Sequence, residues 1–426
     1  MVLQEHIQAY NETNMHRHRR NFEHLAEVLS ERGVQVANLV EELRKFQVAI
    51  PSWALGTGGT RFGRFPMGGE PRNLEEKIAD VGVLHALNGS SDSISLHIPW
   101  DIPEDISAIR QCLSAHALHI DSVNSNTFQD QPGQALSYKF GSLAHTDAAV
   151  RAQAVAHNRV CVDYGMRLGT RTLTVWLADG SNFPGQQHFR QAWQRTAEAM
   201  QEIYESMPAD WTMLIEYKPF EPHFYSMVIP DWGTSRALCQ FLGARARVLV
   251  DLGHHLPNTN IEQIVARLMH FNCLGGFHFN GSMYGDDDLT TASIKPYQLF
   301  LIFQELADAI NDPSLRNPSL AWMIDASHNT KDPMEDLLQS VQNILVTYAK
   351  ALLVDRKALN EAQENNDVVV AEEILRDAFL SDVRPLVAEA LLQAGGALDP
   401  ISVFRRSEIR KQRIGQRGRT AVATGL

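Results

Sequence analysis

The sequence contains few cysteines, and none of them forms part of a recognisable motif. Only four occur among 426 residues, at Cys112, Cys161, Cys239 and Cys273, and no CxxC pair is present. Disulfide-stabilised domains and structural zinc sites both depend on closely spaced thiols. The cysteine pattern therefore argues against a disulfide framework and against a structural zinc site. It favours reduced thiols in a cytosol.

Long apolar runs and an excess of positive charge are also missing. No stretch approaches the roughly 18 consecutive apolar residues of a membrane span. Residues 1–25 lack the continuous apolar core of a secretory signal. The formal net charge of -12 at pH 7 repels polyanions, whose binding depends on Lys and Arg. We therefore expect a cytoplasmic protein with no membrane partner and no nucleic-acid partner.

One basic stretch near the C-terminus departs from this acidic balance. We interpret it as a solvated or subunit-contacting tail, with a ligand-binding patch as the alternative. Its members, interrupted among charged residues only by Glu408, are Arg405, Arg406, Arg410, Lys411, Arg413, Arg417 and Arg419.

Eight short apolar segments alternate with helix-like segments, which is the pattern of a parallel sheet. Strands covered on both faces need such near-continuous apolar character. The number of segments, and the absence of a glycine fingerprint at the first helix, favour an α/β fold of the (β/α)₈ TIM barrel type. The predicted strands are Phe46–Trp53, Ile94–Trp100, Leu118–Asn124, Thr172–Trp176, Met213–Glu216, Val248–Asp251, Gly276–Asn280 and Trp322–Asp325.

Helices are predicted before and after the barrel in the sequence. Within residues 1–45, apolar residues recur at helical spacing, which predicts N-terminal helices that pack on the outside of the barrel. The catalytic barrel is predicted over 46–330, and a C-terminal helical extension with the basic tail over 331–426. The apolar residues of the N-terminal helices are Leu25, Val28, Leu29, Leu39, Val40 and Leu43.

Two helix starts can be predicted from capping residues. Thr259 and Glu262 have the spacing of a capping box. Asp332, Pro333 and Glu335 are predicted as the N-cap, N1 and N3 residues of the helix that follows the last strand.

Ionisable residues end four consecutive predicted strands. Glu216, Asp251 and Asp325 are the last residues of strands five, six and eight, and His278 lies near the end of strand seven. These ends meet at the catalytic face of a TIM barrel. Because converging buried charges are costly without a compensating cation, we predict a divalent metal there. Carboxylate and imidazole ligands suit Mn²⁺, Mg²⁺ or Co²⁺, and Zn²⁺ stays possible.

Further ligands follow these strand ends. His254, Asp286 and Asp288 could hold a second ion, with Glu216 shared between the two. The alternatives are that strand-end acids are helix N-caps and that Asp286 and Asp288 belong to a surface turn. Asp287 is interpreted as a solvated loop charge. His223, His255 and His328 are given no role.

Aromatic residues follow the earlier strands. Aromatic rings around a polar centre suit a sugar, because the rings pack on its C–H face while polar groups fix its hydroxyls; core packing is the alternative. The predicted substrate-binding residues include Trp53, Phe62, His97, Trp100, Phe128 and Trp176, and Asn124 also lies at a strand end. The glycines at 56, 58, 59, 68 and 69 lack the GKS or GKT of a Walker loop, which favours a flexible loop over the pocket and an unphosphorylated sugar.

Taken together, these motifs resemble bacterial L-rhamnose isomerases, specifically the branch that accepts several aldoses such as L-rhamnose and D-allose. Any one motif would be weak, and the set covers about residues 50–355. The motifs are AIPSWALGTGGTRFGRFP, SLHIPWD, VNSNTF, LTVWLADGSNFPGQ, VDLGHHLPNTNIE, GGFHFN, YGDDDL and MIDASHN.

The resemblance implies two divalent ions, usually Mn²⁺, and a homotetramer. It implies that Glu216, Asp251, His278 and Asp325 hold a structural metal, and that His254, Asp286 and Asp288 hold a catalytic one beside Glu216. It also places Lys218 near the substrate and His97 in the pocket, so Asp325, Glu216, Lys218 and His97 are expected to be catalytic. Gly281 and Met283 depart from the family pattern, where an acid and a lysine are expected.

The reaction implied is hydrogen transfer between C1 and C2 of an aldose such as L-rhamnose, giving L-rhamnulose, with D-allose and D-psicose as a related pair. Three alternatives stay open. A sugar 3-epimerase would need two glutamates, and only Glu216 ends a strand. Phosphodiester cleavage conflicts with the acidic balance. A sugar-binding module would not need seven convergent ligands.

Overall fold

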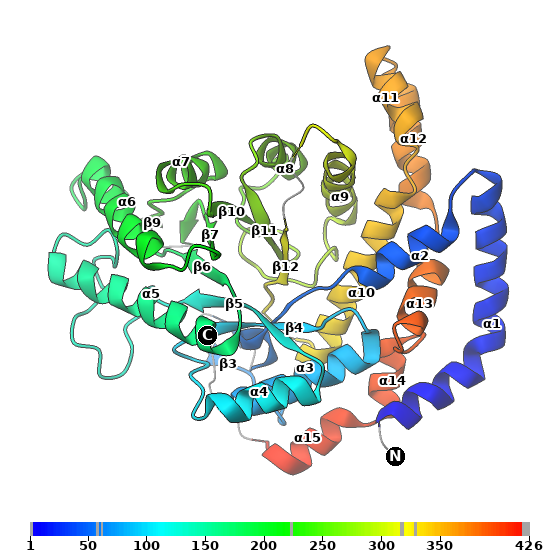
Figure 1. Cartoon of the computed structure of the whole chain (residues 1–426), viewed down its shortest axis with the longest axis horizontal. Coiled ribbons are helices and arrows are strands. Elements are labelled where there is room, and N and C mark those ends of the chain that lie inside the picture. Colours follow the sequence, from blue (N-terminus) through cyan, green and yellow to red (C-terminus); the bar gives the residue numbers. More distant parts are fainter. Residues whose placement is uncertain are drawn as a thin grey trace.

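Eight parallel strands form the centre of the molecule (Figure 1). The computed structural model describes residues 3–56, 59–60, 63–221, 225–315, 319–327 and 330–419. The strands follow the order β1-β4-β5-β6-β7-β10-β11-β12, and every neighbouring pair is parallel. Their bounds are β1 Ile50–Pro51, β4 Ser93–Ile98, β5 His119–Ser125, β6 Thr172–Trp176, β7 Thr212–Glu216, β10 Ala246–Asp251, β11 Leu274–Phe279 and β12 Ala321–Ile324.

The two edges of this sheet meet at one parallel bridge between Ala49 and Met323. There the N–H of Ala49 donates to the carbonyl of Trp322 at 2.7 Å, and the N–H of Ile324 donates to the carbonyl of Ala49 at 3.1 Å. The predicted (β/α)₈ barrel is thus confirmed. Its first strand is shorter than predicted, because Ser52–Leu55 turn into the 3₁₀ helix η1.

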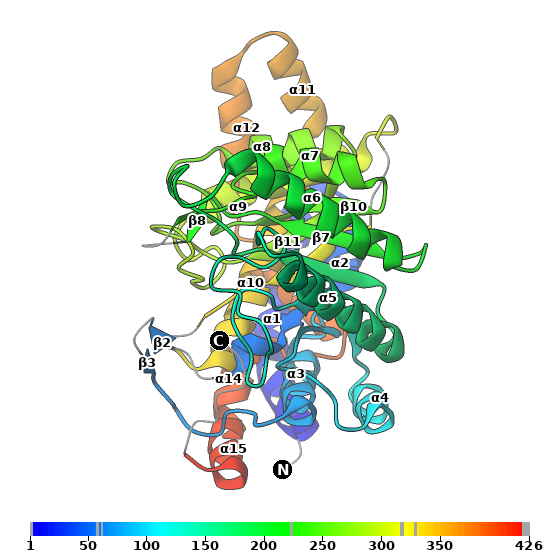
Figure 2. The same cartoon turned by 90° about the vertical axis from the view of Figure 1, so that its left-hand side faces the viewer.

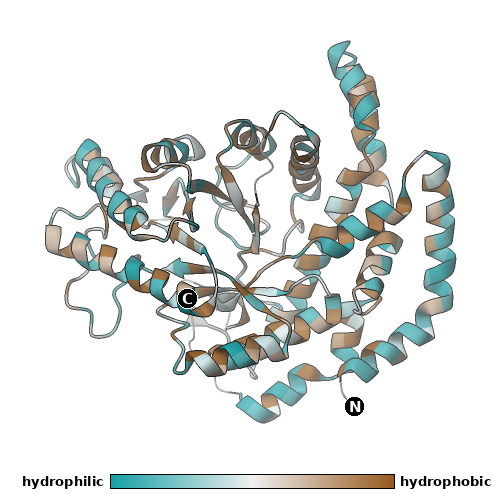
Figure 3. Cartoon of the chain, viewed as in Figure 1, coloured by the Kyte–Doolittle hydropathy of each residue, from teal (hydrophilic) through white to brown (hydrophobic). Residues whose placement is uncertain are grey.

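A helix follows each strand of the barrel and covers it from outside (Figure 1). Figure 3 shows the apolar strands at the centre and more polar residues on the outer helices. This arrangement buries both faces of every strand, which explains the uninterrupted apolar runs in the sequence. The helices are α3 Leu74–Asn88, α4 Ile106–Ala115, α5 Ala148–Leu168, α6 Phe189–Ser206, α7 Trp232–Leu242, α8 Ile261–His270, α9 Pro296–Asn311 and α10 Pro333–Leu352.

Of the two predicted helix starts, one is confirmed and one is wrong. Asp332 caps α10 by accepting from the N–H groups of Met334 and Glu335. Helix α8 is capped by Asn260, which accepts from the N–H of Gln263, and not by Thr259. The Thr259 hydroxyl donates instead to the carbonyl of Leu256, so Asn260 is left as the first side chain that can satisfy the free N–H groups.

Further helices lie before and after the barrel. Helix α1 contacts α13, α14, α2 and α3, so it packs largely on the C-terminal helices and touches the barrel through α3. Its residue Leu29 is buried, whereas Val28 is 40% exposed, so the predicted packing role of Val28 is wrong. The elements are α1 Leu3–Glu31, α2 Val36–Lys45, α11 Arg356–Glu364, α12 Val368–Leu380, α13 Arg384–Gln393, α14 Pro400–Arg406 and α15 Ile409–Arg417.

Two short hairpins complete the described structure: β2 Gly59–Thr60 pairs with β3 Gly63–Arg64, and β8 Phe220–Glu221 pairs with β9 Tyr225–Ser226. Helices α11 and α12 stand out from the body in both views (Figures 1 and 2). Across the described ranges, no helix by itself has the length and apolarity to cross a membrane, although the bent pair α10 and α11 passes that test together.

Part of the basic tail is not solvated, because Arg410, Arg413 and Arg417 pair with carboxylates of the same chain, whereas Arg405 and Lys411 are 67% and 78% exposed. Arg417 pairs with Asp80 on α3 at 2.6 Å, and the two side chains are only 3% and 1% exposed. Arg410 pairs with Asp332 at 2.5 Å. The carbonyl of Gly418 also accepts from the N–H of Gly69, so α15 is attached to the β1–α3 loop as well.

Asp332 therefore has two stabilising roles, and we expect Asp332→Ala to lower the free energy of unfolding by about 2–3 kcal/mol. About 1 kcal/mol comes from the lost cap and the rest from the ion pair with Arg410. Chemical denaturation monitored by circular dichroism measures this loss. The matched control is Asp355→Ala, which removes the N-cap of α11, where the Asp355 carboxylate accepts from the N–H of Ala358. A loss no larger than that of the control, about 1 kcal/mol, would contradict the ion-pair contribution.

Candidate active site

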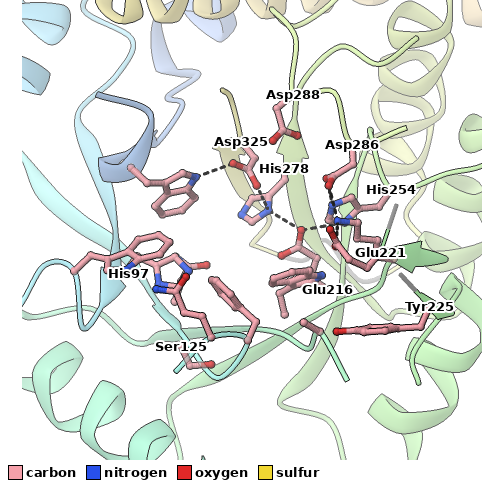
Figure 4. A pocket seen from close by; sticks show the side chains of 18 residues that line it. His97, Ser125, Glu216, Glu221, Tyr225, His254, His278, Asp286, Asp288 and Asp325 are labelled. Carbon is pink, nitrogen blue, oxygen red and sulfur yellow. Dashed lines mark hydrogen bonds and ion pairs between the residues drawn. The ribbon is translucent and has the colours of Figure 1, made fainter. Parts of the chain in front are cut away.

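A cavity of about 470 Å³ opens at the carboxyl ends of the barrel strands (Figure 4). This volume lies in the range of small-molecule binding sites. Every predicted site residue lines this cavity except Asp251 and Phe62. Asp251 is fully buried against its neighbours, and Phe62 lies outside the described residues. His223 and His328, which were given no role, also lie outside them.

Four of the predicted ligands converge on one point, as Figure 4 shows for three of them. Ligand atoms of Glu216, Asp251, His278 and Asp325 all lie within 4.8 Å of one another. The Nδ1 atom of His278 is 3.1 Å from Oε1 of Glu216, 3.7 Å from Oδ2 of Asp325 and 3.8 Å from Oδ2 of Asp251. Four consecutive barrel strands, β7, β10, β11 and β12, supply these side chains within one residue of their carboxyl ends.

Neighbouring groups fix the orientation of this cluster. Oδ1 of Asp251 accepts from the N–H of Gly253 at 2.7 Å and from the amide of Asn280 at 3.0 Å. Oδ1 of Asp325 accepts from Nε1 of Trp53 at 2.7 Å. Outer hydrogen bonds of this kind hold metal ligands in a defined geometry. Asp251 and Asp325 are therefore held in place by groups outside the cluster.

The electrostatics of the cluster call for a positive charge. Burial raises the pKa of Asp325 to about 6 and also raises that of Asp251. Burial would lower the pKa of His278, but the nearby Glu216, Asp325 and Asp251 raise it to about 10. Three buried carboxylates around one imidazole are poorly compensated by a single proton. Carboxylate and imidazole donors in this arrangement fit a divalent cation.

A second group lies beside the first. The Nε2 atom of His254 is 2.9 Å from Oδ1 of Asp286, and Nδ1 of His254 lies 3.3 Å from Oε1 of Glu216. Lys218 pairs with Asp286 at 2.5 Å and with Glu221 at 2.8 Å. Burial would lower the pKa of His254, yet the surrounding acids raise it to about 9.

Asp288 is the third predicted member of this second group. It lines the same cavity, and its Oδ1 is buried with no hydrogen-bond partner among the described residues. Burial, reinforced by Asp286, Asp325 and Asp251, raises its pKa well above the usual value. An unpartnered buried carboxyl oxygen beside His254 and Asp286 fits a second cation, which stays a prediction.

Aromatic side chains form the opposite wall of the cavity. The His97 ring lies 5.5 Å from the Trp53 ring, 4.2 Å from the Trp100 ring and 5.5 Å from the Phe128 ring. Phe128 in turn lies 4.7 Å from Trp176. Burial lowers the pKa of His97 to about 3, so this imidazole is neutral at physiological pH. The wall can thus pack on a neutral molecule and offer it hydrogen bonds.

Several cavity residues were not predicted from the sequence. Ser125 follows Asn124 at the end of β5, and its hydroxyl is buried with no partner among the described residues. Glu221 and Tyr225 come from the β8–β9 hairpin. The position of Ser125 at a strand end was a usable signal. The hairpin residues gave none, because a two-residue strand leaves no periodic pattern.

Residues near the ligands have roles other than those predicted. The Asp287 carboxylate is not a solvated charge, because it accepts from the N–H groups of Met283, Tyr284 and Gly285 and shapes the loop. Gly281 is required by packing, since a Cβ there would lie 2.6 Å from the carbonyl oxygen of Thr290. Neither Gly281 nor Met283 lines the cavity.

Comparison with known proteins agrees with this geometry. The family described as Xylose isomerase-like TIM barrel matches residues 89–334. A probable sugar isomerase of Rhizobium meliloti (strain 1021) is 50% identical over 406 residues, or 95% of this chain and 94% of that protein. A probable sugar isomerase of Mesorhizobium japonicum is 50% identical over 392 residues, or 92% and 90%.

Solved structures show the same architecture. An L-ribulose 3-epimerase superposes with a TM-score of 0.53 at 14% identity, over 76% of this chain and 98% of that one, a likeness of fold alone. The family match over the barrel and the two relatives establish that the chain belongs to the xylose isomerase-like TIM barrel family.

Proposed function

We propose that this protein is a metal-dependent aldose–ketose isomerase that interconverts L-rhamnose and L-rhamnulose and accepts related pairs such as D-allose and D-psicose. The observation that carries the proposal is the convergence of Glu216, Asp251, His278 and Asp325 within 4.8 Å at a cavity of about 470 Å³ with an aromatic wall. The names of both curated relatives, probable sugar isomerases, support the reaction class.

In this proposal, the chain's residues bind two ions. Glu216, Asp251, His278 and Asp325 would hold one ion, and His254, Asp286 and Asp288 the other, with Mn²⁺ as the ion that the resemblance implies. When bound, such ions act as Lewis acids toward neighbouring sugar oxygens.

The remaining groups hold the sugar and move its protons. Trp53, Trp100, Phe128 and Trp176 pack on its C–H face and exclude water. Lys218 donates to a sugar oxygen and stabilises the negative charge that develops there. Asp325, which would also hold one of the ions, is the carboxylate proposed to take up and return a hydroxyl proton of the sugar.

The proposal is tested by measuring ketose formation from L-rhamnose, L-mannose, L-lyxose, D-allose and D-ribose in the presence of Mn²⁺. We expect turnover of L-rhamnose, with D-allose as a second substrate. Conversion of one ketose into another without an aldose would make the protein a 3-epimerase. No product from any of the five sugars would overturn the assignment to L-rhamnose and its relatives.

The hydrogen between C1 and C2 is proposed to move as a hydride. Apart from the predicted metal ligands, Glu221 is the one carboxylate among the described lining residues, and it pairs with Lys218, so it is not placed as a free base. Turnover in D₂O should therefore give products with no deuterium on carbon. Deuterium at C1 or C2, detected by NMR, would exclude the hydride transfer.

Metal binding is expected to release protons. The pKa values of about 9 for His254 and about 10 for His278 mean that both rings are protonated at neutral pH in the metal-free chain. Coordination requires neutral imidazole, so each ring must lose a proton and the affinity must rise with pH between about 6 and 8. Calorimetric titration of Mn²⁺ in buffers of different ionisation enthalpy counts these protons. An affinity independent of pH over that range would contradict the proposed ligand set.

The assembly and location are also proposals. We propose a cytoplasmic homotetramer, as the resemblance implies. Val368, Val369 and Leu380 on the protruding helix α12 are 72%, 71% and 66% exposed, and burial of these side chains between subunits would be favourable. Light scattering coupled to gel filtration gives the mass, and a monomer would contradict this proposal.

A further inference from the structure

A lysine and an aspartate are buried together beside the candidate active site without lining its cavity. Lys77 lies on α3, and Asp101 lies just after β4. Nζ of Lys77 is 2.6 Å from Oδ1 of Asp101, and the two side chains are 1% and 0% exposed. Among the described residues, the hydrogen-bond and ion-pair partners of this pair include none of the predicted metal ligands.

The second oxygen of the same carboxylate connects two strand ends. Oδ2 of Asp101 accepts from the hydroxyl of Ser52 at 2.5 Å and from the backbone N–H of His97 at 2.7 Å. Ser52 begins η1, directly after β1, and His97 is the next-to-last residue of β4. One carboxylate therefore joins α3 to the ends of two neighbouring barrel strands.

These two strand ends carry two adjacent rings of the cavity wall. Trp53 follows Ser52, and its Nε1 donates to Oδ1 of Asp325 at 2.7 Å. The His97 ring meets the Trp53 ring at 5.5 Å and an interplanar angle of 83°. In Figure 4, His97 lies across the cavity from His254 and Asp286. The relative position of Ser52 and His97 therefore sets how far these rings stand from the proposed metal ligands.

A buried ion pair is weak evidence for stability, because apolar residues of similar size often replace it without loss. A better-supported role of a buried ion pair is to favour one arrangement of the groups that surround it over others. The three partners of the Asp101 carboxylate are the Lys77 ammonium, the Ser52 hydroxyl and the His97 backbone N–H. Each comes from a different element, so the carboxylate fixes the position of all three elements relative to one another. Catalytic geometry needs such fixing, since an error of about 1 Å can cost about 100-fold in rate.

We propose that Lys77 and Asp101 are positioning residues of the active site, which hold Trp53 and His97 at the separation that the bound sugar requires. The sugar part of this inference rests on the proposed isomerase function. The placement of the two rings does not, and it can be measured without turnover.

The central test is Asp101→Asn in the full-length protein. An amide cannot accept from Ser52 and His97 and also from Lys77 without leaving one donor unpaired. We expect kcat/KM to fall about 10- to 100-fold, mainly through kcat, while the bound Mn²⁺ per subunit is unchanged. The matched control is Glu389→Gln, which breaks the partly buried pair of Glu389 with His18, 2.7 Å apart, between α13 and α1. This control should leave both kinetic constants unchanged.

A second variant distinguishes a loss of positioning from a loss of folding. In Lys77→Met with Asp101→Leu, no unpaired charge remains buried, so the fold should persist as judged by its melting temperature. Its kinetics should nevertheless resemble those of Asp101→Asn. Fluorine NMR of protein labelled with 5-fluorotryptophan reports directly on Trp53 among the seven tryptophans, with Trp53→Phe giving the assignment. The Trp53 resonance should shift or broaden in both variants and stay in place in Glu389→Gln.

The outcomes separate this inference from the proposed function. Wild-type kinetics in both variants, or the same kinetic loss in Glu389→Gln, would overturn the positioning role. If the wild-type protein makes no ketose from any of the five sugars, the proposed function fails, and the fluorine spectrum decides the inference alone. An unchanged Trp53 resonance in both variants would then overturn it.

Discussion

Glu216→Gln is expected to lower kcat/KM for L-rhamnose by about 1000-fold and to abolish tight binding of Mn²⁺. Oε1 of Glu216 is within 3.1 Å of His278 and 3.3 Å of His254, so this one atom lies between the two proposed ion sites. Glutamine keeps the size of the side chain but removes the charge that both sites share. Steady-state kinetics and metal analysis after gel filtration measure the two effects.

The control for Glu216→Gln is Asp121→Asn. Asp121 lies on β5, outside the cavity lining, where its Oδ2 accepts from the hydroxyl of Ser95 at 3.3 Å. Burial raises its pKa, so it contributes less negative charge than an exposed aspartate. We expect activity and metal content to stay near wild type. If Glu216→Gln retained its Mn²⁺ and its turnover, the convergent cluster would not be the catalytic centre.

Lys218→Met should reduce kcat about 100-fold while the Mn²⁺ content stays near that of the wild type. Burial would lower the pKa of Lys218, but Asp286 and Glu221 raise it, so the ammonium is charged at neutral pH. Its Nζ also lies 5.1 Å from the centre of the Trp176 ring, where a sugar is proposed to bind. Methionine keeps the apolar stem and removes the only property that can stabilise an oxyanion.

The matched control is Lys350→Met, because Nζ of Lys350 also lies over an aromatic ring, at 4.4 Å from the centre of Phe379 and away from the cavity. This variant should turn over sugar at the wild-type rate. A kcat for Lys218→Met within about twofold of the wild type would remove Lys218 from the catalytic groups.

The fold could be predicted from the sequence because buried parallel strands need uninterrupted apolar runs, and these end sharply at polar residues. Glu216, Asp251, His278 and Asp325 stood out for that reason, and the structure brings their ligand atoms within 4.8 Å. The candidate metal-binding group was thus visible as a pattern of strand ends.

Other features of the fold and of the site could not be predicted from the sequence. The ion pair of Asp80 with Arg417 joins residues 337 positions apart, so no local pattern in the tail indicates that Arg417 is buried. The choice between Thr259 and Asn260 as the cap of α8 depends on a one-residue shift of the helix start, since both residue types cap well. Glu221 reaches the cavity from a hairpin too short to show strand periodicity.

The docking of α15 on α3 has a consequence for the order of folding. Asp80 lies in the first helix of the barrel, and its partners Arg413 and Arg417 come from a helix more than 300 residues later in the chain. Until α15 has docked, this carboxylate lacks the cations that allow it to be buried. The first βα unit can therefore complete its packing only together with a long-range contact, and contacts of this kind form slowly.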